Sequence, residues 1–225
     1  MFLAKSLIFP TFSEVLYRFY DQGPRLWHHV HITLLEMSLG MISAIFMAFP
    51  VALLMARYQS IRTFFQPILI AMKAIPMFVL TPFILLFFGF SLLSIVIPTA
   101  LMIFFPLSLS IYRGLMATPK KHLNFFRIHG YRPWQIFFKC RLPFAFPHIF
   151  SGLRIGAATA TMSALAGEWA GGQEGLGIFI QEMRYHFDLE GIYAALLSLI
   201  LLSLGFYGLF LLLEKVIIGK KRYEL

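Results

Sequence analysis

Charged residues are scarce in this sequence of 225 residues, and acidic ones are absent from most of its length. Only 13% of the residues are charged, whereas 59% are hydrophobic, and the mean hydropathy is +0.78. No aspartate or glutamate occurs between Glu36 and Glu168. A soluble domain of this size needs more charge on its surface, so the composition predicts an integral membrane protein.

Residues that carry enzyme chemistry are also few. Cys140 is the only cysteine, which excludes an intrachain disulfide and a cysteine-cluster metal site. The chain has no GxxxxGK[ST] phosphate loop, so we do not expect it to hydrolyse ATP itself. The cluster His28-His29-x-His31 has no carboxylate or cysteine nearby in the sequence, and we interpret it as histidines at headgroup level rather than as a metal site. We therefore expect neither an enzyme nor a bound cofactor.

Five apolar stretches are long enough to cross a membrane, because about 20 apolar residues suffice. Prolines within the second stretch should kink or break it, and the small residues of the fourth should pack it inside a helix bundle. In the first stretch, Gly40 and Ala44 lie one helical turn apart as small contact positions. The predicted spans are Val30–Ala56, Phe64–Phe90, Leu92–Leu115, Ile149–Ala166 and Ile192–Ile218.

The predicted fold is thus an all-α polytopic membrane protein with about five transmembrane helices in one domain, residues 30–218. Residues 1–29 have short apolar runs broken by charges and prolines. We expect an interfacial segment there, because the run is too short for a span and lacks a convincing signal-peptide cleavage site. Residues 219–225 form a basic tail.

Lysine and arginine predict the orientation, since they accumulate on the cytoplasmic side. One side of the predicted spans receives thirteen of the nineteen basic residues, and the other receives four among most of the acids. Residues 118–147, which join the third and fourth predicted spans, and the C-terminus are therefore expected in the cytoplasm, and five spans place the N-terminus outside. The thirteen are Arg57, Arg62, Arg113, Lys120, Lys121, Arg127, Arg132, Lys139, Arg141, Lys215, Lys220, Lys221 and Arg222.

Residues 118–147 form one polar, basic island between the apolar stretches. A first helix should end where Gly130 takes the left-handed conformation, and Pro133 can open a second helix that Pro143 and Pro147 should end. A basic hairpin tethered at both ends by membrane spans cannot easily enter a DNA groove, so we expect no nucleic-acid partner. Two other interpretations stay open: a loop resting its aromatic face on lipid headgroups, and a docking element for a cytoplasmic partner.

The hairpin carries a resemblance to a known family. Gly130, followed after nine residues by Cys140-Arg141-Leu142-Pro143, resembles the G, nine residues, I-x-L-P pattern of the EAA loop in permease subunits of bacterial ABC importers. The family usually has Glu-Ala-Ala where this chain has Asn124-Phe125-Phe126, so the motif carboxylate is missing. Three stretches are also similar to the nitrate/sulfonate/taurine and thiamine-precursor branch: Pro76–Gly89, Ser151–Arg154, and Gly167-Glu168-Trp169 through Gly175-Leu176-Gly177.

The resemblance covers roughly Thr33 to Lys215 and implies a type I importer permease (MetI-like) fold in the bacterial inner membrane. It implies a homodimer that works with cytoplasmic ATP-binding subunits and an extracytoplasmic substrate-binding protein. It also implies coupling to the ATPase through the matching hairpin positions, Asn124, Gly130, Leu142 and Pro143. The alternative function is that of an ion-coupled secondary transporter. Such a transporter needs a midplane carboxylate or a broken-helix ion site, and the acid-free run of residues 37–167 argues against it.

Ionisable residues within or near the spans are candidates for function, because charge in hydrocarbon is costly. We expect Lys73 and Arg154 to snorkel to the cytoplasmic boundary. Glu36, Glu168 and Trp169 are the predicted substrate-path residues: relatives that carry anions often have arginine in an S/T-L-x-R pattern where this chain has Thr33-Leu34-Leu35-Glu36.

Carboxylates on the path disfavour an anion, so a thiamine precursor or a related heterocycle is predicted in preference to a sulfonate, taurine or nitrate. The alternative is that Glu36 only accepts hydrogen bonds from a neighbouring helix, Glu168 caps the turn that follows it, and the binding protein alone selects the ligand.

Overall fold

The computed structural model describes residues 10–72 and 75–219, and the side chains of Met77 and Phe78 are outside this description. Lys73 and the tail beyond Gly219 therefore lie outside the described residues. Every regular element within them is helical. The helices are α2 (Phe12–Asp21), α3 (Gly23–Arg57), α4 (Gln59–Met72), α5 (Met77–Phe88), α6 (Leu92–Met116), α7 (Lys120–Ile128), α8 (Pro133–Ile136), the π-helical turn η1 (Phe137–Arg141), α9 (Leu142–Gly171), α10 (Leu176–Tyr185) and α11 (Leu189–Ile218).

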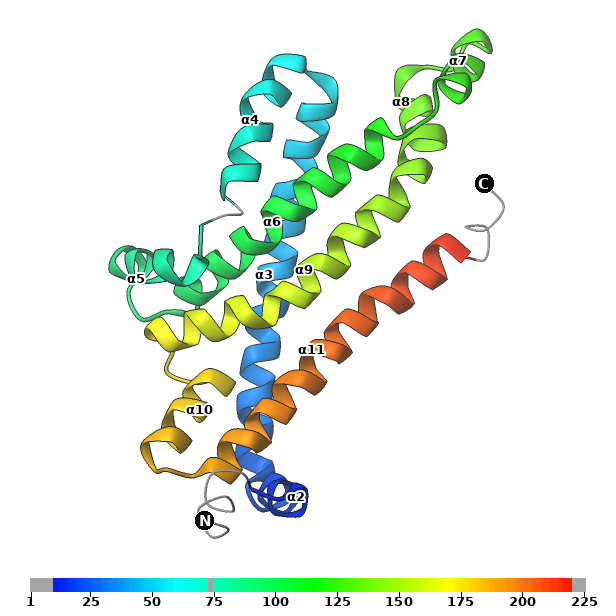
Figure 1. The fold of residues 1–225 in the computed structure, drawn as a ribbon. Helices are drawn as coiled ribbons and strands as arrows, with labels where there is room; N and C mark the ends of the chain where they lie inside the picture. The colour runs from blue at the N-terminus through cyan, green and yellow to red at the C-terminus, as the bar shows by residue number, and fades with distance from the viewer. Residues whose placement is uncertain (1–9, 73–74, 220–225) are drawn as a thin grey trace, which may run out of the picture.

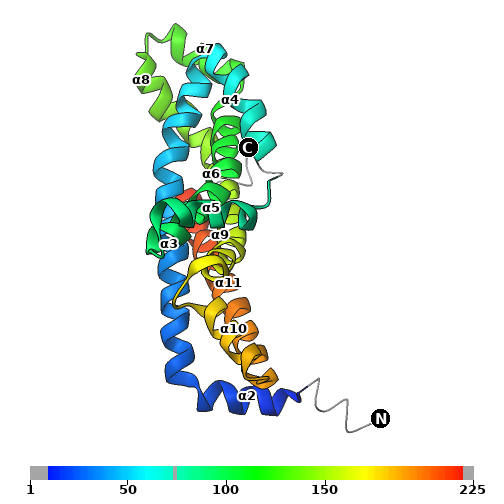
Figure 2. The ribbon, with the colours of Figure 1, turned by 90° about the vertical axis from the view of Figure 1, so that its left-hand side faces the viewer.

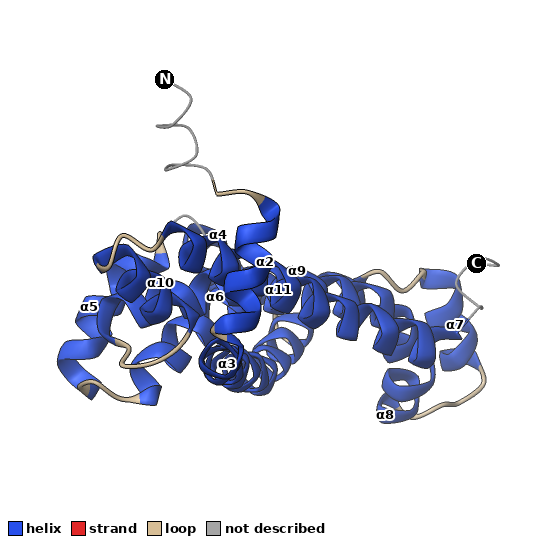
Figure 3. Cartoon of the chain, turned by 90° about the horizontal axis from the view of Figure 1, so that it is seen from below, coloured by secondary structure: helices blue, strands red, loops and turns tan. Residues whose placement is uncertain are grey.

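Long tilted helices form the body of the molecule, with α6 and α9 side by side against α3 (Figure 1). The junction of α3 and α4 and the hairpin of α7 and α8 lie at one end, whereas α2 and the start of α11 lie at the other (Figures 1 and 2). Seen from the end that carries α2, α5 and α10 lie on the opposite side of the molecule from α7 and α8 (Figure 3). The predicted hairpin is thus far from the turn that follows Glu168.

Small residues bring α6 and α9 together, as the composition of the fourth predicted span indicated. A Cβ on Gly152 would lie 2.7 Å from Ser110 Cβ, and one on Gly156 would lie 2.7 Å from Ile103 Cγ2. Gly40 likewise meets Thr99 of α6, so the small contact face predicted for the first span is confirmed. Because glycine has no side chain, the helix backbones approach closely at these positions, and close approach strengthens van der Waals packing between membrane helices.

Four helical stretches are long and apolar enough to cross a membrane: α3, α6, the continuous run Pro133–Gly171, and α11. They correspond to the first, third, fourth and fifth predicted spans, with longer bounds. The second predicted span is not one helix, because α4 ends at Met72 and α5 starts after Pro76. The break predicted at Pro76 is therefore found, since a proline has no N–H to donate to a helical hydrogen bond. In both side views α5 lies across the molecule at mid-height (Figures 1 and 2).

The second arm of the hairpin does not end at Pro143 and Pro147, which corrects the expectation from the sequence. Pro143 occupies the first turn of α9, and Pro147 lies inside it. A π turn precedes Pro143, and in it the Leu142 N–H bonds to the Phe137 carbonyl five residues back. The extra residue in this turn lets the helix continue although Pro143 has no N–H to donate. Residues 133–171 therefore form one helical rod of 39 residues, about 58 Å long.

The chain before the first span folds as α2, ten residues capped by Thr11 and Glu14. This helix lies across the end of α3 and α11 (Figure 2). Arg18 forms an ion pair with Asp188, the N-cap residue of α11, and this contact raises the pKa of the Arg18 guanidinium. Ten residues of helix span only about 15 Å, so α2 alone is too short to cross a bilayer.

Candidate functional site

A tight turn joins α9 to α10, and side chains from two spans satisfy its backbone. The first amides of α10 have no partner within their own helix, as at any helix start. Instead, the Gly175 N–H donates to His29 Nδ1 at 3.1 Å, and the Leu176 N–H donates to Thr33 Oγ1 at 2.9 Å. The Gly177 N–H donates to the Glu168 carboxylate. Helices α3 and α9 thus supply an N-terminal cap for α10 through their side chains.

Thr33 links the two sides of this cap. Its hydroxyl accepts from Leu176 and donates to Glu168 Oε1 at 2.6 Å. Both Thr33 and Glu168 are fully buried, so the bonds are shielded from water and costly to lose. A carboxyl group is well placed here, because a helix N-terminus attracts negative charge.

Glycine is required at the start of this turn for two reasons. Gly175 has φ +110°, a conformation that other residues rarely adopt. A Cβ on Gly175 would also lie 2.3 Å from the Glu168 Cδ atom, inside the carboxyl group itself. The glycine-rich sequence after Glu168 therefore exists to let the backbone approach this side chain.

Glu36 lies beside Glu168 and has the less complete set of partners. Its side chain is 2% exposed, and its Oε2 atom has no hydrogen-bond partner. It lines a pocket of about 170 Å³ together with the α5–α6 connection at Phe90–Leu92 and the turn at Gly171–Glu174. The structure thus brings the two predicted path glutamates together but gives them different surroundings: Glu168 is the cap, and Glu36 faces a cavity.

Trp169, the third predicted path residue, points along the same turn. Its indole Nε1 donates to the Gly177 carbonyl at 3.0 Å, while half of the residue stays exposed. The bond fixes the ring at the edge of the turn and leaves an aromatic surface free.

The histidine cluster differs from the headgroup-level interpretation. His29 is buried against Phe179 and the turn, and His28 pairs with the Glu174 carboxylate at 3.4 Å. A carboxylate is therefore near this cluster in space, although it is distant in sequence. Within the described residues no group of three or more metal-ligating side chains comes together.

Arg154 is also not a snorkelling side chain. Its Nε lies 3.3 Å from Glu214 Oε2, and both side chains are mostly buried between α9 and α11. The sequence signal for this pair was the lone acid in the last span, four residues before its end. That signal does not identify the partner of Glu214, because nothing in the sequence places α11 next to α9.

At the other end of α9, the hairpin presents the predicted coupling residues. Gly130 has φ +72°, which confirms the predicted left-handed residue between the two arms. Asn124 and Pro143 are exposed and Leu142 is half-buried. The hairpin also exposes large apolar side chains, which are Phe125, Ile128, Trp134 and Phe138. An exposed apolar set of this kind marks a surface for protein or membrane contact.

Comparison with known proteins agrees with this architecture. Residues 40–219 match the family described as "Binding-protein-dependent transport system inner membrane component". The chain therefore belongs to the permease subunits of ABC importers, which form the membrane component of transporters for small solutes. It is a multi-pass inner-membrane protein, and its family works with an ATP-binding subunit and a substrate-binding protein.

Several relatives are similar over most of their length. A probable ABC transporter permease of Haemophilus influenzae is 34% identical over 89% of this chain and 82% of its own. The formylaminopyrimidine transport permease ThiX of Halalkalibacterium halodurans is 30% identical over 99% and 89%, and the riboflavin permease RibX of Chloroflexus aurantiacus is 32% identical over 95% and 80%. The taurine permease TauC of Escherichia coli is 26% identical over 82% and 68%.

A solved structure shares the fold. The permease chain in an inward-facing MetNI methionine ABC transporter superposes with a TM-score of 0.74, covering 87% of this chain and 97% of that one at 19% identity. The predicted MetI-like, all-α fold is thus confirmed.

Proposed function

We propose that this chain forms the translocation path for a small neutral or cationic heterocycle of the thiamine-precursor type. The observation that carries the proposal is Glu36, a buried residue that lines a cavity and has one carboxyl oxygen without a hydrogen-bond partner. An amino or ring N–H group of a pyrimidine can donate to that oxygen, whereas a sulfonate or nitrate offers acceptors only. A negatively charged solute beside a Glu36 carboxylate would also be repelled, because two unit negative charges about 4 Å apart repel by roughly 4 kcal/mol at an effective dielectric of 20.

The relatives support the same substrate class. Two of the permeases at 30% identity or more are named for formylaminopyrimidine and riboflavin, both nitrogen heterocycles, whereas the taurine permease is less similar. Trp169 offers an aromatic face near the turn that could stack on such a ring. A sulfonate, taurine or nitrate permease is the alternative; nitrate and simple alkanesulfonates would leave Glu36 without a favourable contact, whereas the ammonium group of taurine could donate to it.

A homodimer completes the path in this proposal. The turn at Gly172–Gly175 and the break before α5 lie at mid-height, and non-helical backbone at such a depth requires cover by protein or a water-filled cavity. Helix α5 and the loop after it expose Phe83, Leu86, Phe87 and Phe90. A second copy against this edge would cover these side chains and close the Glu36 pocket from the other side.

Coupling would run along the rod of residues 133–171. ATP hydrolysis takes place in a separate subunit, which holds the hairpin in a groove of its surface. Because the second arm of the hairpin and α9 are one helix, a displacement of α8 moves the far end that carries Glu168. Movement there shifts the cap of α10 and the wall of the Glu36 pocket, which changes access to the path. The hairpin and the C-terminus face the cytoplasm in this arrangement.

Competition of uptake tests the substrate class. Cells that contain the complete transporter with its cognate binding protein should take up a labelled aminopyrimidine, and excess thiamine precursor should compete where taurine, alkanesulfonate and nitrate do not. Glu36→Gln should lower this uptake. Glu190→Gln, a matched change outside the pocket, should leave it unchanged. Tight selection of taurine, an alkanesulfonate or nitrate would overturn the proposal.

A further inference from the structure

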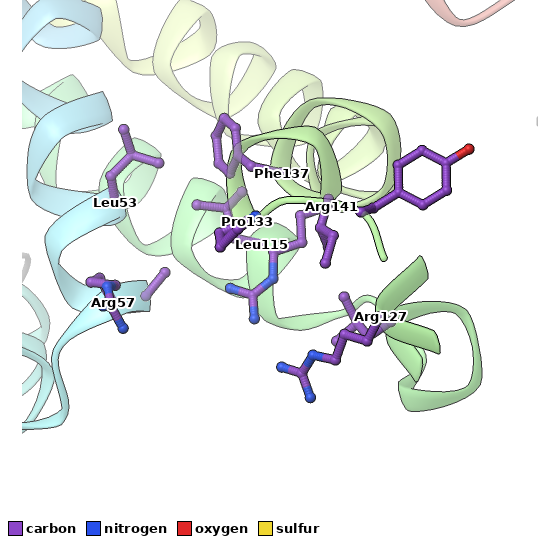
Figure 4. Close-up of a pocket in the computed structure, with 11 residues that line it drawn as sticks. Leu53, Arg57, Leu115, Arg127, Pro133, Phe137 and Arg141 are labelled. Atoms are coloured by element: carbon purple, nitrogen blue, oxygen red, sulfur yellow. The ribbon is translucent and has the colours of Figure 1, made fainter. Parts of the chain in front are cut away.

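A second pocket lies between the end of α3 and the hairpin, far from Glu36. It has a volume of about 620 Å³. Three arginines contribute to its lining: Arg57 from the last turn of α3, Arg127 from α7 and Arg141 from η1. Figure 4 shows these side chains around one space, with Leu53, Leu115 and Phe137 along its wall.

None of the three guanidinium groups has a carboxylate partner among the described residues. No ion pair or side-chain hydrogen bond involves them there, and the one contact of Arg57 is with the face of the Tyr58 ring at 5.6 Å. All three arginines fall within the run of residues 37–167, so no carboxylate is near them in the sequence. Arg18, Arg25 and Arg154, in contrast, each meet a carboxylate. Within the part of the chain that the structure describes, three cations thus surround one cavity without a compensating carboxylate, which makes the cavity suited to an anion.

The lining suits a phosphate group that is attached to an apolar body. Guanidinium groups present a planar fork of N–H donors that matches phosphate oxygens, and several of them can share one group. The remaining wall is apolar, from Leu53, Ala56, Leu115, Ile136 and Phe137. A fully solvated inorganic ion would gain nothing from such a wall, whereas a phosphate attached to an apolar body would use both parts.

We propose that this pocket binds the phosphate group of an amphipathic anion. Two sources share that chemistry: an anionic phospholipid of the leaflet at this end, or a small phosphorylated organic solute. The last turns of α3 and α6 supply part of the wall, so the pocket lies at the level where the spans leave the membrane. Basic pockets at this level on the cytoplasmic side bind anionic headgroups. The assignment to the cytoplasmic side rests on the proposed orientation, but the arginine cluster does not.

Occupancy would connect α3 to both arms of the hairpin. Arg127 belongs to the first arm and Arg141 to the second, so one phosphate held by both would fix the angle between them relative to Arg57. The ligand would thereby stabilise the hairpin in one position.

The test uses the purified full chain in nanodiscs and measures thermal stability and ligand occupancy by native mass spectrometry. The probes are phosphatidylglycerol against phosphatidylcholine for the lipid source, and phenyl phosphate against inorganic phosphate for the solute source. Arg127→Gln/Arg141→Gln removes two pocket cations. The matched control, Lys120→Gln/Lys121→Gln, removes the same charge from exposed positions of the hairpin outside the pocket.

We expect phosphatidylglycerol or phenyl phosphate to bind and to stabilise the chain. The arginine double variant should weaken that binding about 25-fold, at roughly 1 kcal/mol for each cation, and the lysine control by much less. A response to the lipid alone assigns the lipid source, and a response to phenyl phosphate alone assigns the solute source.

Three results would overturn the proposal. The first is no binding of either probe, and the second is an equal loss in both double variants, which would show diffuse surface charge. The third is unchanged probe binding in the arginine variant together with lost association of the ATP-binding subunit, which would make the arginines a protein interface. Reporter fusions that reverse the proposed orientation would move the site to the other leaflet without removing it.

Discussion

Removal of the Glu168 side chain should release the start of α10. Glu168→Ala leaves the Thr33 hydroxyl and the Gly177 N–H without their acceptor, in a place where water cannot replace it. Each buried donor left unsatisfied costs about 1–3 kcal/mol, so the local loss is about 2–6 kcal/mol. Hydrogen exchange of the full chain in nanodiscs should show faster exchange in the segment 172–178, by at least about 25-fold at 2 kcal/mol.

Variants at Thr33 separate the cap from a simple effect of volume. Thr33→Val keeps the shape but removes both the acceptor for Leu176 and the donor to Glu168, so it should speed exchange in the same segment. Thr33→Ser keeps the hydroxyl and should exchange like the unmodified chain. If neither Glu168→Ala nor Thr33→Val changes exchange at 172–178, these side chains do not hold the turn, and the geometric argument for the cap is wrong.

Three further predictions concern the hairpin, the topology and the α9–α11 contact. Gly130→Val should reduce transport while membrane insertion persists, because a β-branched residue strains the left-handed position, whereas Gly130→Asn should transport nearly normally; equal uptake by both variants contradicts the coupling role. Reporter fusions should place Met1 outside and Leu225 in the cytoplasm, and a cytoplasmic signal at both ends would refute five crossings. Arg154→Gln and Glu214→Gln should each destabilise the chain by about 3–5 kcal/mol, and the double variant should recover part of the loss in thermal unfolding; additive losses would mean that the pair is not coupled.

The long helices could be predicted from the sequence because their signal is local. Runs of apolar residues located α3, α6, α9 and α11, and the small residues of α9 correctly indicated a buried helix. Proline was the less reliable signal. Pro76 coincides with a real break, whereas Pro143 and Pro147 lie inside a continuous helix. The π turn before Pro143 lets the helix continue at that residue, because its backbone bond reaches five residues back instead of four. No local rule distinguishes these cases, since the result depends on how neighbouring helices hold the chain.

The candidate site was only half predictable for a related reason. Glu36 and Glu168 stood out because carboxyl groups are rare in apolar stretches, and the structure places them together. No sequence pattern indicates that His29 and Thr33 cap a helix that starts more than 140 residues later. Both are unremarkable polar residues on α3, and only the fold brings them to the turn. The three pocket arginines lie far apart in the sequence, and they share one pocket only because the hairpin lies close to the end of α3.

The continuous rod of residues 133–171 connects these observations into a mechanism. A flexible joint at Pro143 would let the hairpin move without moving α9, and coupling would then need another route. Because the helix continues through η1, the hairpin end and the Glu168 end are parts of one rigid element. The hydrogen bonds of Glu168 then pass any displacement to α10 and, through Thr33, to α3. In the proposed mechanism, a motion that begins at the hairpin would therefore reach the Glu36 pocket through a few named contacts, each of which a single substitution can break.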